Sequence, residues 1–343
     1  MQNKNLPPYT GRDKVIKMRV LVTGAAGFIG FHLARALNAR GDFVIGLDNF
    51  NAYYDPQLKF ARKRVLQALG IEILQTDIRE TAQIQRLIQE HEITHFVHLA
   101  AQAGVRHSLG NPDDYVASNL DGFVSVLEAC RLTPTIKLIY ASSSSVYGCN
   151  KKIPFSPEDP TDLPANLYGA TKKANEVMAQ AYHHLYGLSV TGLRYFTAYG
   201  PWGRPDMAYY RFAECIAKQK TIQVFNHGQM RRDFTYIDDI IQGTLAAIDL
   251  GAPSEIFNLG NHCPVDLPLL IQLLEEALGQ QAIIELLPAQ PGEVLETFAD
   301  IEKSTRMLGF KPTVHLREGI GKFVDWWKEY DYSQTSPHSR SLA

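Results

Sequence analysis

Tyr168 and Lys172 stand four residues apart in the segment YGATK, and Ser143 precedes them in ASSSSVYG. Positions i and i+4 share one face of a helix, so the phenol and the ammonium can enter the same pocket. A phenol with a reference pKa of about 10 is a poor base, and a neighbouring cation lowers that pKa by favouring the phenolate. The pattern predicts an acid–base set that removes the proton of an alcohol while its hydride passes to a nicotinamide cofactor.

Each part of this pattern also has an ordinary structural interpretation. YxxxK occurs by chance in many helices, and a serine-rich run is usually a loop. Here the serines follow the apolar segment KLIYA at residues 137–141, which favours a buried parallel strand. They would then lie at the carboxyl end of that strand, where open α/β sheets bind ligands. This placement favours a catalytic role for Ser143, Tyr168 and Lys172.

A glycine-rich turn near the start of the chain predicts a dinucleotide site. MRVLVTG at residues 18–24 is typical of a strand, and residues 31–41 have the pattern of an amphipathic helix. Gly24 permits the tight turn, Gly27 lets the backbone approach a pyrophosphate, and Gly30 allows close helix packing. The amino end of the helix would face the phosphates.

Acidic residues close the next two apolar runs. Residues 42–50 read as the second strand, with Asp48 at its end. A carboxylate there accepts hydrogen bonds from an adenosine ribose and repels a 2′-phosphate, so NAD is favoured over NADP. The alternative for Asp48 is a surface turn. Asp77 ends residues 71–77 and could contact adenine. In the fourth strand and its loop, residues 95–106, we expect His95 and His98 to be packing residues.

The alternation of strand and helix patterns predicts an α/β fold. We expect a doubly wound parallel (Rossmann) sheet with a smaller C-terminal α/β domain that binds the substrate. The boundaries that we expect are a flexible extension at 1–17, an NAD-binding domain at 18–192, a mainly substrate-binding domain at 193–330 and a disordered tail at 331–343. Part of 235–260 is expected to return to the large sheet.

Composition limits the classes of function. The 343 residues carry a net charge of -2, with a pI of about 6.6 and no long basic stretch, which argues against nucleic acid as a partner. Four scattered cysteines show no metal-binding spacing and fit a reducing cytoplasm. No apolar run is long enough to cross a bilayer, so we expect no membrane partner.

The segment after residue 192 changes character. Residues 192–212 are rich in aromatic residues, Gly and Pro, which indicates an irregular, ligand-binding segment. Farther on, Phe225 could stack on a planar base, and Arg231 and Arg232 suit recognition of a diphosphate. The alternative for the two arginines is a solvated basic turn.

Several of these segments together resemble nucleotide-sugar epimerases of the extended short-chain dehydrogenase/reductase family, and in particular UDP-glucuronate 4-epimerases. The segments are LVTGAAGFIGFHLA, DNFNAYYD, HLAAQAGVR, SSSSVYG, YGATKKANE, RYFTAYGPWGRPDM, RRDFTYIDD and PGEVLETFAD. The more discriminating ones are DNFNAYYD and FTAYGPWGRPDM. The resemblance extends from residue 19 to about residue 330.

The resemblance implies NAD as cofactor and a UDP-sugar as substrate. It implies that the catalytic residues are Ser143, Tyr168 and Lys172. It implies cofactor binding by Gly24, Gly27, Phe28, Ile29, Gly30, Asp48, Asn49, Asn51, Asp77, Ile78, Ala100, Ala101, Gln102, Asn119, Tyr168, Lys172 and Tyr195. It implies substrate binding by Ser143, Ser144, Ser145, Thr197, Arg204, Val224, Phe225, Arg232 and Glu293. No metal is implied.

The implied reaction interconverts UDP-glucuronate and UDP-galacturonate through a 4-keto sugar, in a route to polysaccharide. Ser144, Ser145, Thr197 and Arg204 would hold the C5 carboxylate, although Arg204 could instead be structural. Ser145 stands where dehydratases and uronate decarboxylases of the family have an acidic residue, which argues against those two activities.

Other interpretations stay open at this point. The chain could be a neutral-hexose 4-epimerase acting on UDP-glucose and UDP-galactose, or a UDP-uronate decarboxylase. It could also be a sensor that binds NAD or a nucleotide sugar without catalysis. The family resemblance also implies a homodimer formed by helices near residues 119–130 and 168–186. The apolar spacing in those helices fits dimerisation and core packing equally well.

Overall fold

The computed structural model describes residues 18–290, 292 and 294–335. Its centre is a parallel sheet of seven strands in the order β10-β6-β5-β4-β1-β2-β3. The strands are β1 (Arg19–Thr23), β2 (Phe43–Asp48), β3 (Glu72–Gln75), β4 (His95–His98), β5 (Lys137–Ser143), β6 (Ser189–Tyr195) and β10 (Ser254–Leu259). The strand order reverses between β1 and β4, as in a doubly wound sheet, so the predicted fold class is confirmed.

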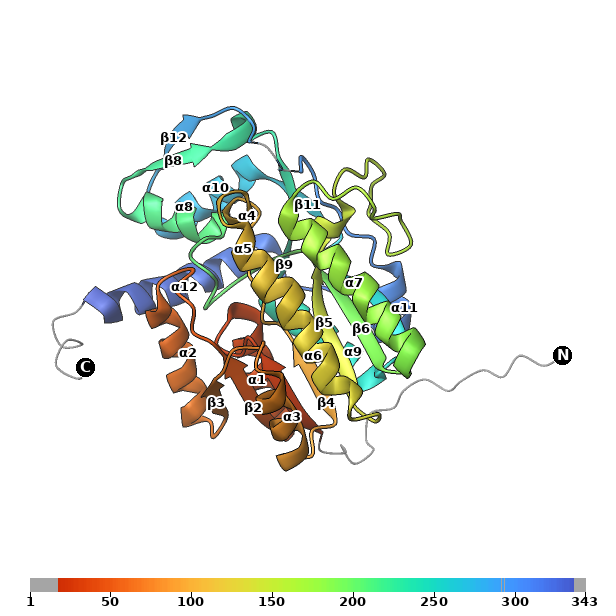
Figure 1. The fold of residues 1–343 in the computed structure, drawn as a ribbon. Helices are drawn as coiled ribbons and strands as arrows, with labels where there is room; N and C mark the ends of the chain where they lie inside the picture. Colours follow the sequence, from red (N-terminus) through yellow and green to blue (C-terminus); the bar gives the residue numbers. More distant parts are fainter. Residues whose placement is uncertain (1–17, 291, 293, 336–343) are drawn as a thin grey trace, which may run out of the picture.

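Helices cover both faces of this sheet (Figure 1). One face carries α1 (Phe28–Arg40) and α9 (Ile237–Leu250), which contact each other, and α2 (Pro56–Ala68) lies beside α1. The other face carries α3 (Thr81–Glu90), α6 (Gly122–Arg131) and α7 (Leu167–Tyr186). Short segments precede α6: α4 (His107–Gly110), α5 (Pro112–Tyr115) and the π-helix η1 (Val116–Asp121).

A smaller part of the chain lies beyond the carboxyl ends of the strands (Figure 1). It contains a three-stranded sheet of β11 (Pro264–Asp266), β9 (Arg231–Tyr236) and β7 (Thr197–Tyr199), and a two-stranded sheet of β12 (Ile283–Leu286) and β8 (Thr221–Val224). Near these sheets lie α8 (Ala208–Ala217), η3 (Phe225–Gly228), α10 (Leu267–Leu278) and α12 (Leu316–Thr335), whereas η2 (Ser144–Tyr147) contacts α7 and α11 (Glu302–Leu308) packs against α9 and β10.

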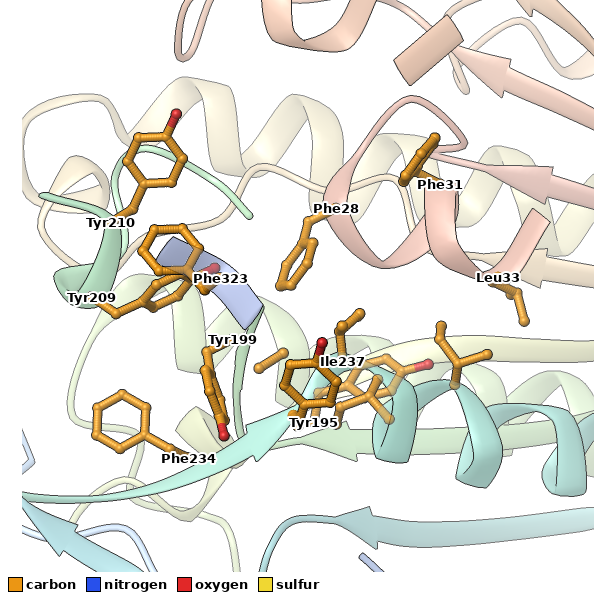
Figure 2. Packing of buried hydrophobic residues seen from close by; sticks show 14 of the residues in the cluster. Phe28, Phe31, Leu33, Tyr195, Tyr199, Tyr209, Tyr210, Phe234, Ile237 and Phe323 are labelled. Atoms are coloured by element: carbon orange, nitrogen blue, oxygen red, sulfur yellow. The ribbon is translucent and has the colours of Figure 1, made fainter. Parts of the chain in front are cut away.

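A continuous apolar cluster joins the two parts (Figure 2). Phe28 comes from the start of α1 and Tyr195 from the end of β6, while Tyr209 and Phe323 come from α8 and α12. The rings of Tyr209 and Phe323 meet edge to face at 4.8 Å between centroids. Burial of this surface fixes the smaller part over the ends of the strands.

The C-terminal helix is longer than the sequence predicted. α12 continues to Thr335, into the stretch expected to be a disordered tail. Phe323 and Trp327 bury one face of the helix, and Trp326 and Tyr330 pack against Trp202. This packing stabilises a helix that its polar C-terminal sequence does not reveal. The rest of that tail and the expected extension at 1–17 lie outside the described residues.

The described residues contain neither a membrane-spanning helix nor a metal-binding cluster. None of the helices within 18–335 is both long and apolar enough to span a membrane. In the same ranges no group of three or more His, Cys, Asp and Glu side chains is arranged to hold a metal ion.

Candidate active site

A cavity of about 440 Å³ opens where the strands of the large sheet end. Its lining includes residues at or directly after the ends of β1, β2, β4, β5 and β6. The opposite wall comes from the segment that follows β6 and from the smaller part of the chain. This is the position where doubly wound sheets bind nucleotide ligands.

Most of the predicted site residues line this cavity. From the cofactor set these are Gly24, Gly27, Phe28, Ile29, Gly30, Asp48, Asn49, Asn51, Asp77, Ile78, Ala100, Ala101, Gln102, Tyr168, Lys172 and Tyr195. From the substrate set they are Ser143, Ser144, Ser145, Thr197, Arg204 and Arg232. Asn119, Val224 and Phe225 do not line it, and Glu293 lies outside the described residues.

The catalytic candidates converge on one point of the cavity. Ser143 is the last residue of β5, while Tyr168 and Lys172 project from the first two turns of α7. Asn166 caps this helix, because its side chain accepts a hydrogen bond from the amide of Gly169 at 2.8 Å. The predicted helical spacing therefore brings the tyrosine and the lysine to one face.

The pKa of Tyr168 differs from the expectation. Burial raises the pKa of Tyr168, while its hydrogen bond with Ser143 and the charge of Arg204 act in the lowering direction. Lys172 instead donates a hydrogen bond to the carbonyl of Ala141 at 2.8 Å. Of the charges near the phenol, Arg204 acts to lower this pKa and Asp206 acts to raise it. The lowering of this pKa by Lys172 stays a prediction. Burial lowers the pKa of Lys172 itself to about 8.

The glycine turn between β1 and α1 is shaped for a close backbone contact. Gly24 has a φ of +68°, and a Cβ there would lie 2.8 Å from the amide nitrogen of Ala100. A Cβ on Gly30 would collide with the backbone of Gly24. α1 begins without a side-chain cap, and its first residues, Phe28 to Gly30, line the cavity. These features fit the diphosphate of a dinucleotide.

Asp48 lies at the end of β2, as predicted, and has a structural task as well. One carboxylate oxygen accepts a hydrogen bond from Ala26 in the glycine turn at 3.1 Å, and the other accepts one from Phe50 at 2.9 Å. Lys59 of α2 lies 3.9 Å from Asp48 and lines the cavity. Sequence reasoning assigned no individual role to Lys59, although it follows shortly after the DNFNAYYD segment.

Asn119 acts behind the cavity wall. Its side chain accepts a hydrogen bond from the amide of Gln102 at 2.8 Å and donates one to the carbonyl of Gln102 at 3.0 Å. Asn119 therefore holds the loop after β4, which lines the cavity. Gln102 itself lines the cavity, and its side chain hydrogen-bonds the hydroxyl of Tyr115. Direct contact of Asn119 with a cofactor stays a prediction.

The substrate side contains a charged group close to the catalytic tyrosine. The guanidinium of Arg204 lies 3.3 Å from the carboxylate of Asp206. Tyr53, which the sequence left without a role, donates a hydrogen bond from its hydroxyl to the same carboxylate at 3.1 Å. Elsewhere on this side, Val224 is buried in the core, and the ring of Phe225 lies under the guanidinium of Arg106 at 4.1 Å.

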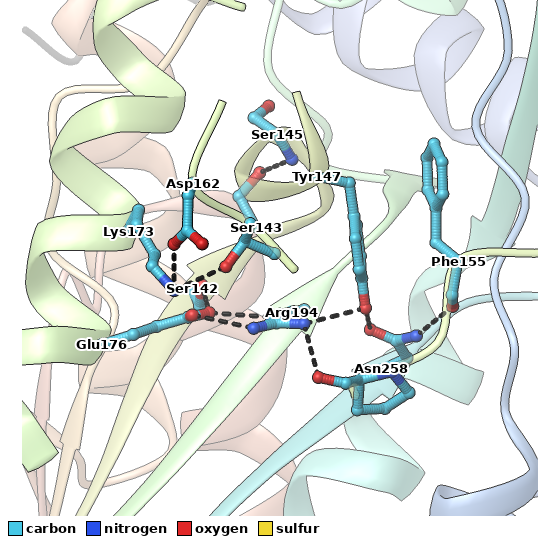
Figure 3. Close-up of polar contacts among 12 residues, drawn as sticks. Ser142, Ser143, Ser145, Tyr147, Phe155, Asp162, Lys173, Glu176, Arg194 and Asn258 are labelled. Carbon is cyan, nitrogen blue, oxygen red and sulfur yellow. Dashed lines mark hydrogen bonds and ion pairs between the residues drawn. The ribbon is translucent and has the colours of Figure 1, made fainter. Parts of the chain in front are cut away.

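A buried polar network supports the catalytic residues from behind (Figure 3). Glu176, one turn after Lys172 on α7, accepts two hydrogen bonds from Arg194 of β6 at 2.8 and 2.9 Å. It also accepts one from Ser142 at 2.6 Å, next to Ser143. Arg194 continues to the hydroxyl of Tyr147, which donates to Asn258 of β10. The network joins the catalytic helix, the catalytic strand end and the edge strand.

The parallel sheet, the glycine turn and the Ser143, Tyr168 and Lys172 set define a dinucleotide-dependent enzyme of the extended short-chain dehydrogenase/reductase class. A family model described as "NAD dependent epimerase/dehydratase family" matches residues 20–260. The chain belongs to this family. The family resemblance and the prediction of NAD as cofactor are therefore confirmed.

Named relatives and solved structures place the similarity more narrowly. The chain is 51% identical over 329 residues to UDP-glucuronate 4-epimerase 4 of Arabidopsis thaliana, covering 91% of this chain and 75% of that protein. A UDP-glucuronic acid 4-epimerase from Bacillus cereus, solved with UDP-glucuronic acid and NAD, is 37% identical with a TM-score of 0.86, covering 91% of this chain and 100% of that one. A UDP-glucose 4-epimerase from Thermus thermophilus, solved with NAD, is 30% identical with a TM-score of 0.82, covering 91% and 99%.

Proposed function

We propose that this enzyme interconverts UDP-glucuronate and UDP-galacturonate by NAD-dependent epimerisation at C4. The observation that carries the proposal is a single cavity that contains the acid–base set, the glycine turn and Arg204, a cation close enough to act on Tyr168. The 51% identity to the plant UDP-glucuronate 4-epimerase and the bound UDP-glucuronic acid in the Bacillus cereus enzyme support this substrate.

Each residue of the site has a separate role in the proposed reaction. Tyr168 takes the proton of the sugar 4-hydroxyl and later returns it, while Ser143 hydrogen-bonds the same oxygen and orients it. Arg204 stabilises the phenolate through its charge, which opposes the effect of burial. Lys172 holds the nicotinamide ribose. NAD supplies a reversible hydride acceptor for C4, so one cofactor can serve each turnover.

The carboxylate at C5 makes additional demands on the site. The 4-keto sugar is a β-keto acid, and it loses carbon dioxide when the carboxylate bond aligns with the carbonyl π system. Ser144, Ser145, Thr197 and Arg204 line the cavity and offer donors that hold the carboxylate out of that alignment. Ser145 is not a carboxylic acid, so the acid–base group for elimination or decarboxylation is missing from that position.

We propose a homodimer formed through η1, α6 and α7. The supporting observation is a set of exposed apolar side chains on these elements, namely Val116, Val124, Val177, Leu185 and Tyr186. Burial of such side chains against a second copy would remove apolar surface from water. We also propose a cytoplasmic enzyme, because all four cysteines are free thiols.

The test is turnover of UDP-glucuronate without added cofactor, with products separated against UDP-galacturonate, UDP-xylose and UDP-glucose standards. We expect UDP-galacturonate from the wild type and none from Tyr168→Phe. The matched control is Tyr199→Phe, which removes a buried hydroxyl that has no partner among the described residues and lies outside the cavity lining. UDP-xylose as the main product would show a decarboxylase, and faster turnover of UDP-galactose than of UDP-galacturonate would show a neutral-hexose epimerase.

A further inference from the structure

The two most discriminating segments of the sequence meet at the cavity. Tyr53 belongs to DNFNAYYD, and Asp206 and Arg204 belong to FTAYGPWGRPDM. The hydroxyl of Tyr53 donates to Oδ2 of Asp206 at 3.1 Å, and the same oxygen lies 3.3 Å from Nη2 of Arg204. We call these three residues the Tyr53–Asp206–Arg204 relay. It connects the loop after β2 with the segment after β7, across 153 positions between Tyr53 and Asp206.

Tyr53 is held in place by its surroundings. Its ring packs edge to face on His107 at 4.9 Å. Gly104 has a φ of +100°, and a Cβ at that position would collide with the Tyr53 hydroxyl. Burial and the charge of Asp206 raise the pKa of Tyr53, so the hydroxyl keeps its proton as a donor. The loop after β4 therefore leaves the space that the Tyr53 hydroxyl occupies.

The hydroxyl of Tyr53 affects how strongly Asp206 pairs with Arg204. Oδ1 of Asp206 is buried without a hydrogen-bond partner among the described residues, so Oδ2 receives both contacts. A second carboxylate entering the cavity would compete with Asp206 for the Arg204 guanidinium. A carboxylate that accepts a hydroxyl hydrogen bond can share its cation more readily, because part of its charge is already stabilised. Tyr53 thus makes Arg204 available to an anionic ligand.

We propose that Tyr53 is a specificity-determining positioning residue, which acts through Asp206 to present Arg204 to the C5 carboxylate of a uronate. The inference rests on the proposed function for the identity of the sugar. A neutral hexose has a hydroxymethyl group at C5 and makes no demand on the charge of Arg204. Loss of the Tyr53 hydroxyl should therefore weaken binding of the uronate and spare the neutral sugar.

The test measures dissociation constants of UDP-glucuronate and UDP-glucose by titration calorimetry in a Tyr168→Phe background, which stops turnover. We define the preference for the uronate as the dissociation constant of UDP-glucose divided by that of UDP-glucuronate. Tyr53→Phe should lower the preference for the uronate about tenfold, the scale of one hydrogen bond to a charged group. Gly104→Ala, which displaces the same hydroxyl, should lower it similarly, and Tyr199→Phe should leave it unchanged.

A double substitution tests whether Tyr53 acts through Arg204. Arg204→Gln should abolish most of the preference, and adding Tyr53→Phe should then lower it no further. An unchanged preference in Tyr53→Phe would overturn the inference, and so would losses that add in the double variant, because these would indicate direct contact of Tyr53 with the sugar. If the Tyr168→Phe protein itself showed no preference for UDP-glucuronate, the proposed function would be overturned. That outcome differs from the two results that would overturn the role of Tyr53.

Discussion

Replacement of Glu176 by glutamine would leave the Arg194 guanidinium buried without its anion. Both side chains are 3% exposed, and the carboxylate accepts two hydrogen bonds from Arg194 and one from Ser142 (Figure 3). Removal of one partner of a buried ion pair costs about 3–5 kcal/mol, because the remaining charge has no compensation and cannot reach water. We expect a loss of this size in Glu176→Gln.

The assay is thermal unfolding followed by circular dichroism. With an unfolding entropy of about 2 cal/mol/K per residue, a chain of 343 residues should lose about 4–7 °C in Tm. Glu214→Gln is the matched control, because Glu214 pairs with Lys218 on the surface of α8, where both side chains are more than two-fifths exposed. A solvated pair of this kind contributes little, so its loss should give no resolvable change.

The same assay can refute the reasoning about the buried pair. Equal Tm values for the two glutamine variants would mean that Glu176 and Arg194 do not depend on each other for stability. Addition of Arg194→Met to Glu176→Gln supplies a further check. It removes the uncompensated charge, so part of the lost stability should return.

Two further predictions concern residues of the cavity. Burial lowers the pKa of Lys172 to about 8, so between that pH and its unfolded value of 10.5 the unfolded state binds more protons and stability rises with pH. Lys172→Met lacks this gain, so the Tm of the wild type minus the Tm of Lys172→Met should increase from pH 8 to pH 10; a constant difference would contradict the shifted pKa. Ser144→Ala or Ser145→Ala should weaken binding of UDP-glucuronate or release UDP-xylose, as measured by calorimetry and chromatography. Variants with wild-type affinity and no UDP-xylose would exclude the protective role of the serines.

Local patterns explain which parts of the site could be predicted from sequence. Gly30 is required by a contact with the backbone of Gly24 in the same turn, and the spacing of Tyr168 and Lys172 is a property of one helix. Each of these signals lies within a few residues of chain. The strand-and-helix alternation that predicted the sheet is local in the same sense.

Contacts between distant segments could not be predicted in this way. Nothing near Tyr53 in the sequence indicates that its hydroxyl reaches Asp206. No pattern near Phe225 indicated that its ring would lie under the guanidinium of Arg106, while its stacking on a base stays a prediction. The raised pKa of Tyr168 depends on burial by the whole cavity, which no local pattern of residues indicates.

The apolar cluster that includes Phe28, Tyr195, Tyr209 and Phe323 has a consequence for how ligands enter (Figure 2). A hinge motion that separated the two parts of the chain would expose these rings to water, at a cost of about 25 cal/mol for each Å² of apolar surface. Rigid domain opening is therefore disfavoured, and exchange of a UDP-sugar should depend on rearrangement of the loops at the mouth. For the same reason the chain should melt as one cooperative unit, with a single calorimetric transition.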